Sequence, residues 1–114
     1  MSTDRLQDLA RRVQQFADER EWGPFHSPKN LASALVVEAG ELLEHFQWMN
    51  EADSRQLDPE RRQAVAHEMA DVMLYLVQLG NALGIDVIDA ARAKMVINAE
   101  RYPVETSRGH SRKA

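Results

Sequence analysis

Four acidic residues at matched spacings are the side chains in this sequence most able to do chemistry. Glu38 and Glu41 lie three residues apart within VVEAGELL, and Glu68 and Asp71 repeat that spacing within HEMADVML. Residues i and i+3 share one face of a helix, with Cβ atoms about 5 to 6 Å apart, so each pair directs two carboxylates the same way. Unpaired carboxylates among aliphatic residues are costly to desolvate, which indicates that something positive binds them.

The residue numbers predict that the two pairs meet. In two antiparallel helices joined by a short loop, facing residues have numbers that add to a constant, and both Glu38 with Asp71 and Glu41 with Glu68 add to 109. Any one of these acids would ordinarily be a solvated surface charge, but four at matching heights favour a shared site. Because all four offer hard oxygen ligands, we predict that they bind Mg²⁺, with Mn²⁺ as a substitute.

The charge of the chain points to the reaction class. Fourteen Lys and Arg stand against eighteen Asp and Glu, for a net charge of −4. Residues 101–114 hold four basic residues and one acidic residue, so residues 1–100 carry −7. An acidic body disfavours binding to duplex nucleic acid. It can recruit a triphosphate through metal ions that neutralise both partners, so we expect metal-assisted hydrolysis of a phosphoanhydride.

Helices are the elements expected to position these acids. The chain is 44% hydrophobic and 6% aromatic, with five Gly and four Pro, which is too apolar for disorder and too poor in turn residues for a β-sandwich. Ser2 or Thr3 is a candidate first N-cap, Asp58 before Pro59 marks a helix start, and Gly84 suits a helix end. We predict an all-α fold with helices over about 3–20, 28 or 30 to about 49, 59–83 and 86–101, joined by an aromatic connection at 21–29 and a polar one at 50–58.

Length and hydropathy predict one domain in an oligomer. The 114 residues suit a single domain, which we place at 1–103, followed by a flexible, basic C-terminal tail over 104–114. Between Val65 and Leu83 the third helix is hydrophobic nearly all round, which is typical of a helix buried on several sides. One chain of this size has little material to surround it, so we predict a homodimer or a homotetramer.

Composition also bears on location. The sequence has no cysteine, Met1 to Arg12 is too charged to resemble a signal peptide, and no apolar run approaches the roughly 18 residues of a membrane span. We therefore expect a soluble, cytoplasmic protein that does not associate with a membrane.

The acids and the motifs around them resemble the MazG-like superfamily of all-α nucleotide pyrophosphohydrolases. EAGE, then 26 residues, then EMAD is its E-x-x-E and E-x-x-D signature, and EREW, FHSPKNL, FQW and RYPV are most similar to the dCTP pyrophosphatase subgroup, over most of residues 16–109. The resemblance implies an oligomeric four-helix bundle. It also implies Mg²⁺-dependent conversion of a dNTP, in particular dCTP or a modified dCTP, to its monophosphate and pyrophosphate, a role in cleaning the nucleotide pool.

The same resemblance implies roles for individual residues. Glu38, Glu41, Glu68 and Asp71 become metal ligands, and Glu41 also orients or deprotonates the water that attacks the α-phosphorus. Helical spacing predicts that His45 and Trp48 continue the stripe of Glu38 and Glu41 on one helix. On the next helix, Tyr75 and Gln78 continue the stripe of Glu68 and Asp71. From sequence alone, Trp22 and Trp48 are also compatible with core anchors and His26 with a loop histidine. The implied substrate contacts are Trp22, His26, Trp48, Tyr75, Lys94, Asn98 and Arg108.

Two other classes compete with this interpretation. A di-iron carboxylate bundle needs Glu three residues before His on two helices, whereas Leu42 precedes His45 and Ala64 precedes His67, so that class is excluded. A non-enzymatic helical module for oligomerisation or partner binding, with a vestigial metal site, stays open. Release of pyrophosphate from a dNTP separates the two, because a partner module releases none.

Overall fold

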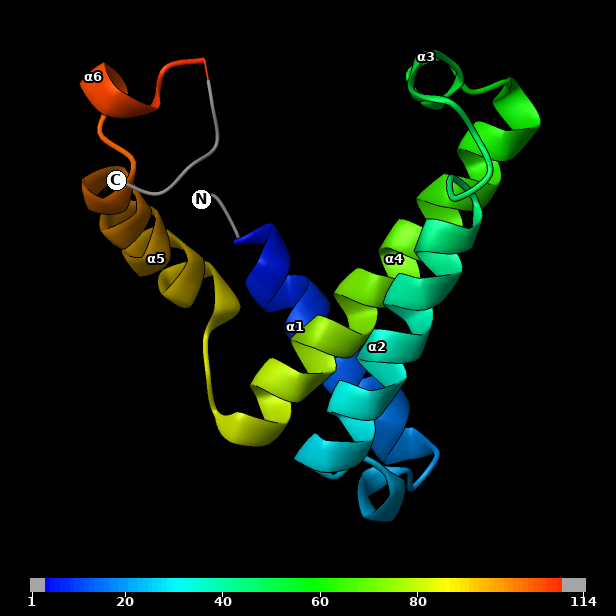
Figure 1. Ribbon diagram of the computed structural model, residues 1–114. Coiled ribbons are helices and arrows are strands. Elements are labelled where there is room, and N and C mark those ends of the chain that lie inside the picture. The colour runs from blue at the N-terminus through cyan, green and yellow to red at the C-terminus, as the bar shows by residue number, and fades with distance from the viewer. Residues whose placement is uncertain (1–3, 110–114) are drawn as a thin grey trace. The chain divides into compact units, whose positions relative to one another are not determined.

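The computed structural model describes residues 4–109, and over that range the chain is helical with no strand (Figure 1). The prediction of an all-α fold with four long helices is confirmed. The long helices are α1 (Arg5–Glu19), α2 (Pro28–Glu44), α4 (Pro59–Leu83) and α5 (Val87–Arg101), and the short elements are the 3₁₀ turn η1 (Gly23–Phe25), α3 (Glu51–Ser54) and α6 (Val104–Ser107).

Side-chain caps begin each long helix. The Asp58 carboxylate accepts a hydrogen bond from the Arg61 amide at 2.8 Å, with Pro59 at the first helical position, as predicted. Ser27 caps α2 and Asp86 caps α5 in the same way. The cap of α1 is Asp4, which accepts from the amides of the second and third helical residues. The prediction that Ser2 or Thr3 caps this helix was wrong. Both residues lie outside the described range.

α2 ends earlier than the sequence pattern predicts, at Glu44 instead of about Met49. The amides of His45, Phe46 and Met49 bond to carbonyls three residues back, which tightens the chain into successive turns. The Arg61 guanidinium on α4 donates to the His45 carbonyl at 3.0 Å, so an acceptor left free at the helix end is satisfied from another element. Trp48 therefore does not continue the helical stripe of Glu38 and Glu41.

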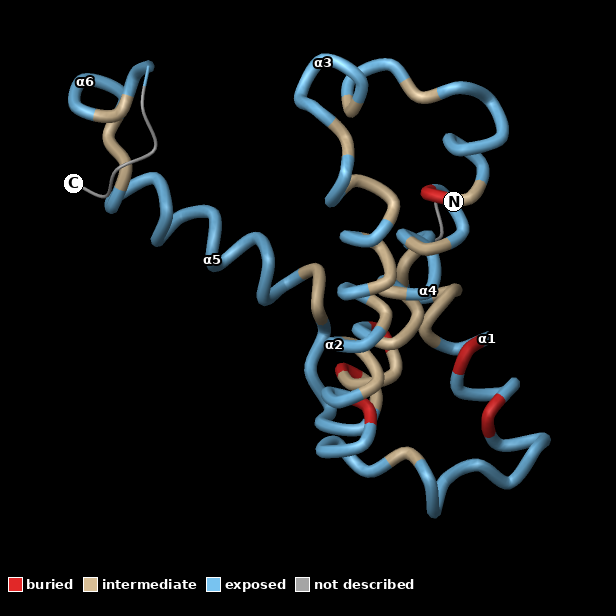
Figure 2. Tube along the Cα trace, turned by 45° about the vertical axis from the view of Figure 1, so that its right-hand side comes forward, coloured by how far each residue is buried: buried red, intermediate tan, exposed pale blue. Residues whose placement is uncertain are grey.

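The chain divides into two compact units, residues 1–84 and 85–114, which are described separately. In the first unit α2 and α4 lie side by side as an antiparallel hairpin, and α1 packs against α4 (Figure 1). The Asn81 amide on α4 donates to the Ala10 carbonyl on α1 at 2.9 Å. Buried apolar side chains come from all three helices (Figure 2): Val13, Ala17, Leu31, Val65 and Val77.

The second unit contains α5 and α6. Gly84, with φ of +67°, ends α4 in the left-handed conformation predicted for it, and α5 then runs to Arg101 as expected. α6 forms a single turn inside the segment predicted to be a flexible tail, while residues 110–114 of that segment lie outside the described range. The predicted domain boundary after residue 103 stays a prediction. Within residues 4–109 no single helix has the length and apolar content to cross a membrane.

Candidate metal centre

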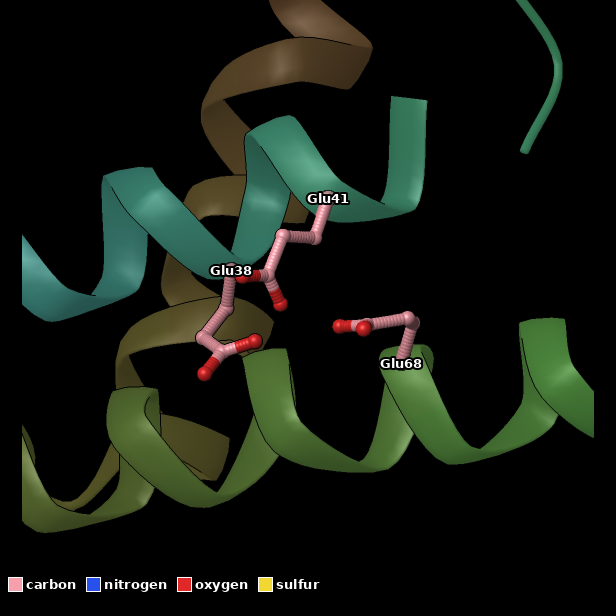
Figure 3. A group of neighbouring side chains, drawn as sticks. All are labelled: Glu38, Glu41 and Glu68. Atoms are coloured by element: carbon pink, nitrogen blue, oxygen red, sulfur yellow. The ribbon is translucent and has the colours of Figure 1, made fainter. Parts of the chain in front are cut away.

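Three of the four predicted acids come together between α2 and α4. Glu38 and Glu41 extend from one face of α2, and Glu68 extends toward them from α4 (Figure 3). One oxygen from each carboxylate lies within 4.8 Å of those of the other two. Oxygens on opposite sides of a Mg²⁺ octahedron are about 4.2 Å apart, since each bond is about 2.1 Å long. Adjacent oxygens of the same octahedron are about 3.0 Å apart, so the three side chains would have to draw closer together to bind one ion.

The electrostatics of the cluster favour a cation. The Oε2 atoms of Glu38 and Glu68 are buried and have no hydrogen-bond partner among the described residues. Hydrogen bonding to the neighbouring Glu41, burial, and the proximity of Glu68 raise the pKa of Glu38 from 4.5 to about 7. In the described part of the chain the ion pairs join Asp8 to Arg11 and Arg12, so no Lys or Arg neutralises these three acids. An added divalent ion would do so.

Asp71 is the predicted ligand that does not join this cluster. It lies one turn beyond Glu68 on α4 and is exposed, and its carboxylate is not among the three that converge. Its role as a ligand stays a prediction. The convergence of Glu38, Glu41 and Glu68 agrees with the register inferred from the residue numbers.

The raised pKa of Glu38 leads to a pH dependence that can be measured. Because Mg²⁺ must displace the proton, we expect its affinity to rise by up to about tenfold per pH unit below pH 7 and to level off above it. Without metal, the folded state holds this proton more tightly than the unfolded state does. The resulting stability is complete below pH 4.5 and is lost as pH rises to about 7.

Titration calorimetry with Mg²⁺ and thermal unfolding in EDTA, each across this range, measure the two effects. Glu38→Gln should remove most of the pH dependence of unfolding. An affinity and an unfolding temperature that both stay level between pH 4.5 and 7 would contradict the assigned environment of Glu38.

An aromatic corner follows α1. The Trp22 amide donates to the Ala17 carbonyl and the Glu21 amide donates to the Asp18 carbonyl, both at 3.0 Å, which is the Schellman pattern of a helix C-terminus. Glu21 takes the left-handed position with φ of +52°, where glycine is usual, so the sequence carries no clear signal for this turn. The turn places the Trp22 ring against Phe16, with centroids 5.6 Å apart.

The predicted substrate residues occupy different environments. His26 is half-buried and meets the edge of Trp22, with ring centroids 5.7 Å apart. Tyr75 is half-buried on α4, one turn beyond Asp71. Trp48 is 89% exposed in the turns after α2, so it is not a core anchor of this chain. The remaining three, Lys94, Asn98 and Arg108, are exposed residues of the second unit. Their substrate roles stay predictions.

One polar residue gained importance only from the structure. Gln78 was placed by its spacing on the stripe of Glu68, Asp71 and Tyr75, without a role. Its side-chain oxygen is buried and has no hydrogen-bond partner among residues 4–109. The spacing could have drawn attention to it, but burial of that oxygen depends on how α1 packs against the hairpin.

The sequence of this chain is similar to a protein-family model and to several known proteins. The model of the MazG-like family matches residues 34–114. dCTP pyrophosphatase 1 of Rattus norvegicus is 44% identical over 106 residues, which cover 91% of this chain and 62% of the relative. The Homo sapiens protein of that name is 43% identical over 110 residues, covering 95% and 65%. The chain thus spans less than two thirds of the length of these mammalian relatives.

A phage protein and an archaeal protein are also similar to this chain. The dATP/dGTP diphosphohydrolase of Cyanophage S-2L is 33% identical over 89 residues, covering 78% of this chain and 70% of the relative. A pyrophosphatase from Archaeoglobus fulgidus, known from its crystal structure, is 38% identical with a TM-score of 0.81, covering 90% of this chain and 96% of that one.

Proposed function

The chain belongs to the MazG-like family, and we propose that it is a metal-dependent nucleoside triphosphate pyrophosphohydrolase. The observation that carries the proposal is the convergence of three carboxylates with two buried, unpartnered oxygens. The pyrophosphatase and diphosphohydrolase names of the similar proteins support the same reaction class. Mg²⁺ is the proposed ion, with Mn²⁺ as a substitute, because all the ligand atoms are carboxylate oxygens.

The three acids have separable roles in this proposal. Glu38 and Glu68 hold the metal, since their buried oxygens otherwise lack a partner. Neither oxygen of Glu41 is both buried and without a hydrogen-bond partner. We therefore assign Glu41 to orient the attacking water and to accept its proton. When bound, the ion would act as a Lewis acid and neutralise part of the charge on the phosphates. Attack at the α-phosphorus releases pyrophosphate and leaves the monophosphate.

The proposed substrate is a dNTP, with dCTP or a modified dCTP preferred, consistent with a role in cleaning the nucleotide pool. The mammalian relatives are named for dCTP, which supports this preference, whereas the cyanophage relative is named for dATP and dGTP. Base preference therefore differs among the proteins similar to this chain.

A panel of dNTPs with Mg²⁺, followed by pyrophosphate release, tests the proposal. We expect turnover that needs the metal and is fastest with dCTP or 5-modified dCTP, while EDTA should abolish it. Release of no pyrophosphate from any nucleotide would instead favour the non-enzymatic partner module.

We also propose that the chain forms a homodimer or a homotetramer. The hairpin of α2 and α4 exposes several large apolar side chains, among them Val36, Val37 and Leu43 on α2. Apolar surface that gathers on one face is typical of an interface between proteins. On α4 the exposed residues Met69, Met73 and Leu76 follow the i, i+4, i+7 spacing of one helical stripe. A second copy of the chain would cover this stripe, which is defined here as the α4 apolar stripe.

A further inference from the structure

One side chain ties the turn before α2 to that helix. The Asn30 side-chain nitrogen on α2 donates a hydrogen bond to the Phe25 carbonyl at 3.1 Å, five positions back in the sequence. Because a carbonyl oxygen only accepts, this bond also fixes the orientation of the Asn30 amide. Among residues 4–109 no other hydrogen bond joins residues 22–26 to α2. The backbone amide of Asn30 separately donates to the Ser27 hydroxyl that caps the helix.

The remaining hydrogen bonds of the turn are local or lead back to α1. The backbone amides of Phe25 and His26 donate to carbonyls three residues back, at 2.8 and 3.1 Å, so these bonds close η1 on itself. The Trp22 amide attaches the start of the turn to the Ala17 carbonyl at the end of α1. The Asn30 side chain therefore supplies the attachment on the α2 side.

The turn carries aromatic rings that are exposed. Phe16, Trp22 and Phe25 are all exposed, and the rings of Phe16 and Trp22 are in contact. Exposed apolar side chains that gather in one place are typical of a binding surface. Backbone strain is also frequent at functional sites, and Glu21, directly before Trp22, holds the left-handed conformation that is unfavourable for any residue but glycine. Both features indicate that the placement of this turn matters to a ligand.

We propose that Asn30 is a positioning residue, which holds η1 against the start of α2 and so sets the orientation of the Trp22 and His26 rings toward a nucleotide. The inference rests on the proposed function and on the substrate contacts predicted for those two rings, and it adds a residue that acts through them. Asn30 lies eight residues before Glu38 on α2, or about 12 Å along the helix axis, so it is remote from the three acids. Its effect therefore falls on nucleotide binding.

The kinetic test compares Asn30→Ala and Asn30→Asp with wild type. A carboxylate cannot donate to the Phe25 carbonyl, whereas its charge is favourable in the first turn of α2, and the alanine variant checks that the added charge is not the cause. We expect each variant to raise KM for dCTP about fivefold and to leave kcat within about twofold of wild type. Ser33→Ala is the matched control, because the Ser33 hydroxyl donates at 2.9 Å to a carbonyl within α2. It should leave both constants unchanged.

Tryptophan fluorescence of the metal-free protein tests the attachment of the turn without a nucleotide. The sequence has two tryptophans, so in a Trp48→Phe background Trp22 is the only one. In that background Asn30→Ala should shift the emission of Trp22 to longer wavelength and increase its quenching by acrylamide, because the ring is held less firmly against Phe16. Ser33→Ala should leave both signals unchanged.

An unchanged KM in a folded Asn30→Ala variant would overturn the inference, and so would unchanged fluorescence or a loss of kcat as large as the change in KM. Circular dichroism shows whether the variant is folded. If the alanine variant folds poorly, Asn30→Asp carries both tests, since its charge favours the start of α2. Failure of the proposed function is a different outcome, in which the wild type hydrolyses no nucleotide. The fluorescence of Trp22 then still decides whether Asn30 holds the turn.

Discussion

Glu68→Gln is expected to lower kcat/KM for a dNTP by about 1000-fold. The amide keeps the size of the side chain but carries no charge, so the proposed metal site loses one of its three converging carboxylates. A bound ion supplies several kcal/mol of transition-state stabilisation, and each 1.36 kcal/mol corresponds to about tenfold in rate. Pyrophosphate release measures the rate, and titration calorimetry with Mg²⁺ measures the loss of binding.

The unfolding temperature separates this effect from simple loss of structure. Removing the Glu68 charge relieves repulsion within the cluster, so in EDTA the variant should be at least as stable as wild type. Glu44→Gln is the matched control, because Glu44 is exposed at the end of α2 and does not belong to the cluster. It should retain nearly full activity. Wild-type turnover by the Glu68 variant, or an equal loss in the Glu44 variant, would refute the assignment of the site.

Met73→Glu is expected to dissociate the oligomer. In the single chain Met73 is 46% exposed and forms the middle of the α4 apolar stripe, so the substitution should leave the protomer folded. In the proposed assembly the new carboxylate would be buried without a partner, at a cost of several kcal/mol. We therefore expect at least about a 100-fold weaker association, measured by sedimentation velocity against the 13.0 kDa of one chain.

Gln63→Glu is the control for added charge, since Gln63 is an exposed polar residue on the same helix. This variant should assemble like wild type. Sedimentation of the wild type as a monomer at all concentrations would contradict the proposal.

Much of the helical architecture was predictable because it depends on local chemistry. Asp58 with Pro59, Gly84 and Asp86 act on the backbone within a few residues of themselves, and each marks the boundary expected of it. The meeting of Glu38, Glu41 and Glu68 was predictable for a related reason. Two regular helices and a short connection allow few registers, and the equal sums of residue numbers indicate one that places Glu38 and Glu41 near Glu68.

Other features depended on contacts between residues distant in sequence. The Arg61 guanidinium donates to the His45 carbonyl, sixteen positions away in the sequence, where α2 ends and a series of turns begins. Because the helix ends there, Trp48 does not lie on the helical stripe predicted for it. A non-glycine left-handed residue, Glu21, turns the chain after α1 and has no clear sequence signal. Residues of α1, η1, α2 and α4 together line a cavity of about 150 Å³ in the first unit, with Gln78 in its wall. The sequence by itself thus determined the helices and their acidic site through local periodicity and capping, whereas the ends, turns and burial that shape the cavity beside it were decided by tertiary packing.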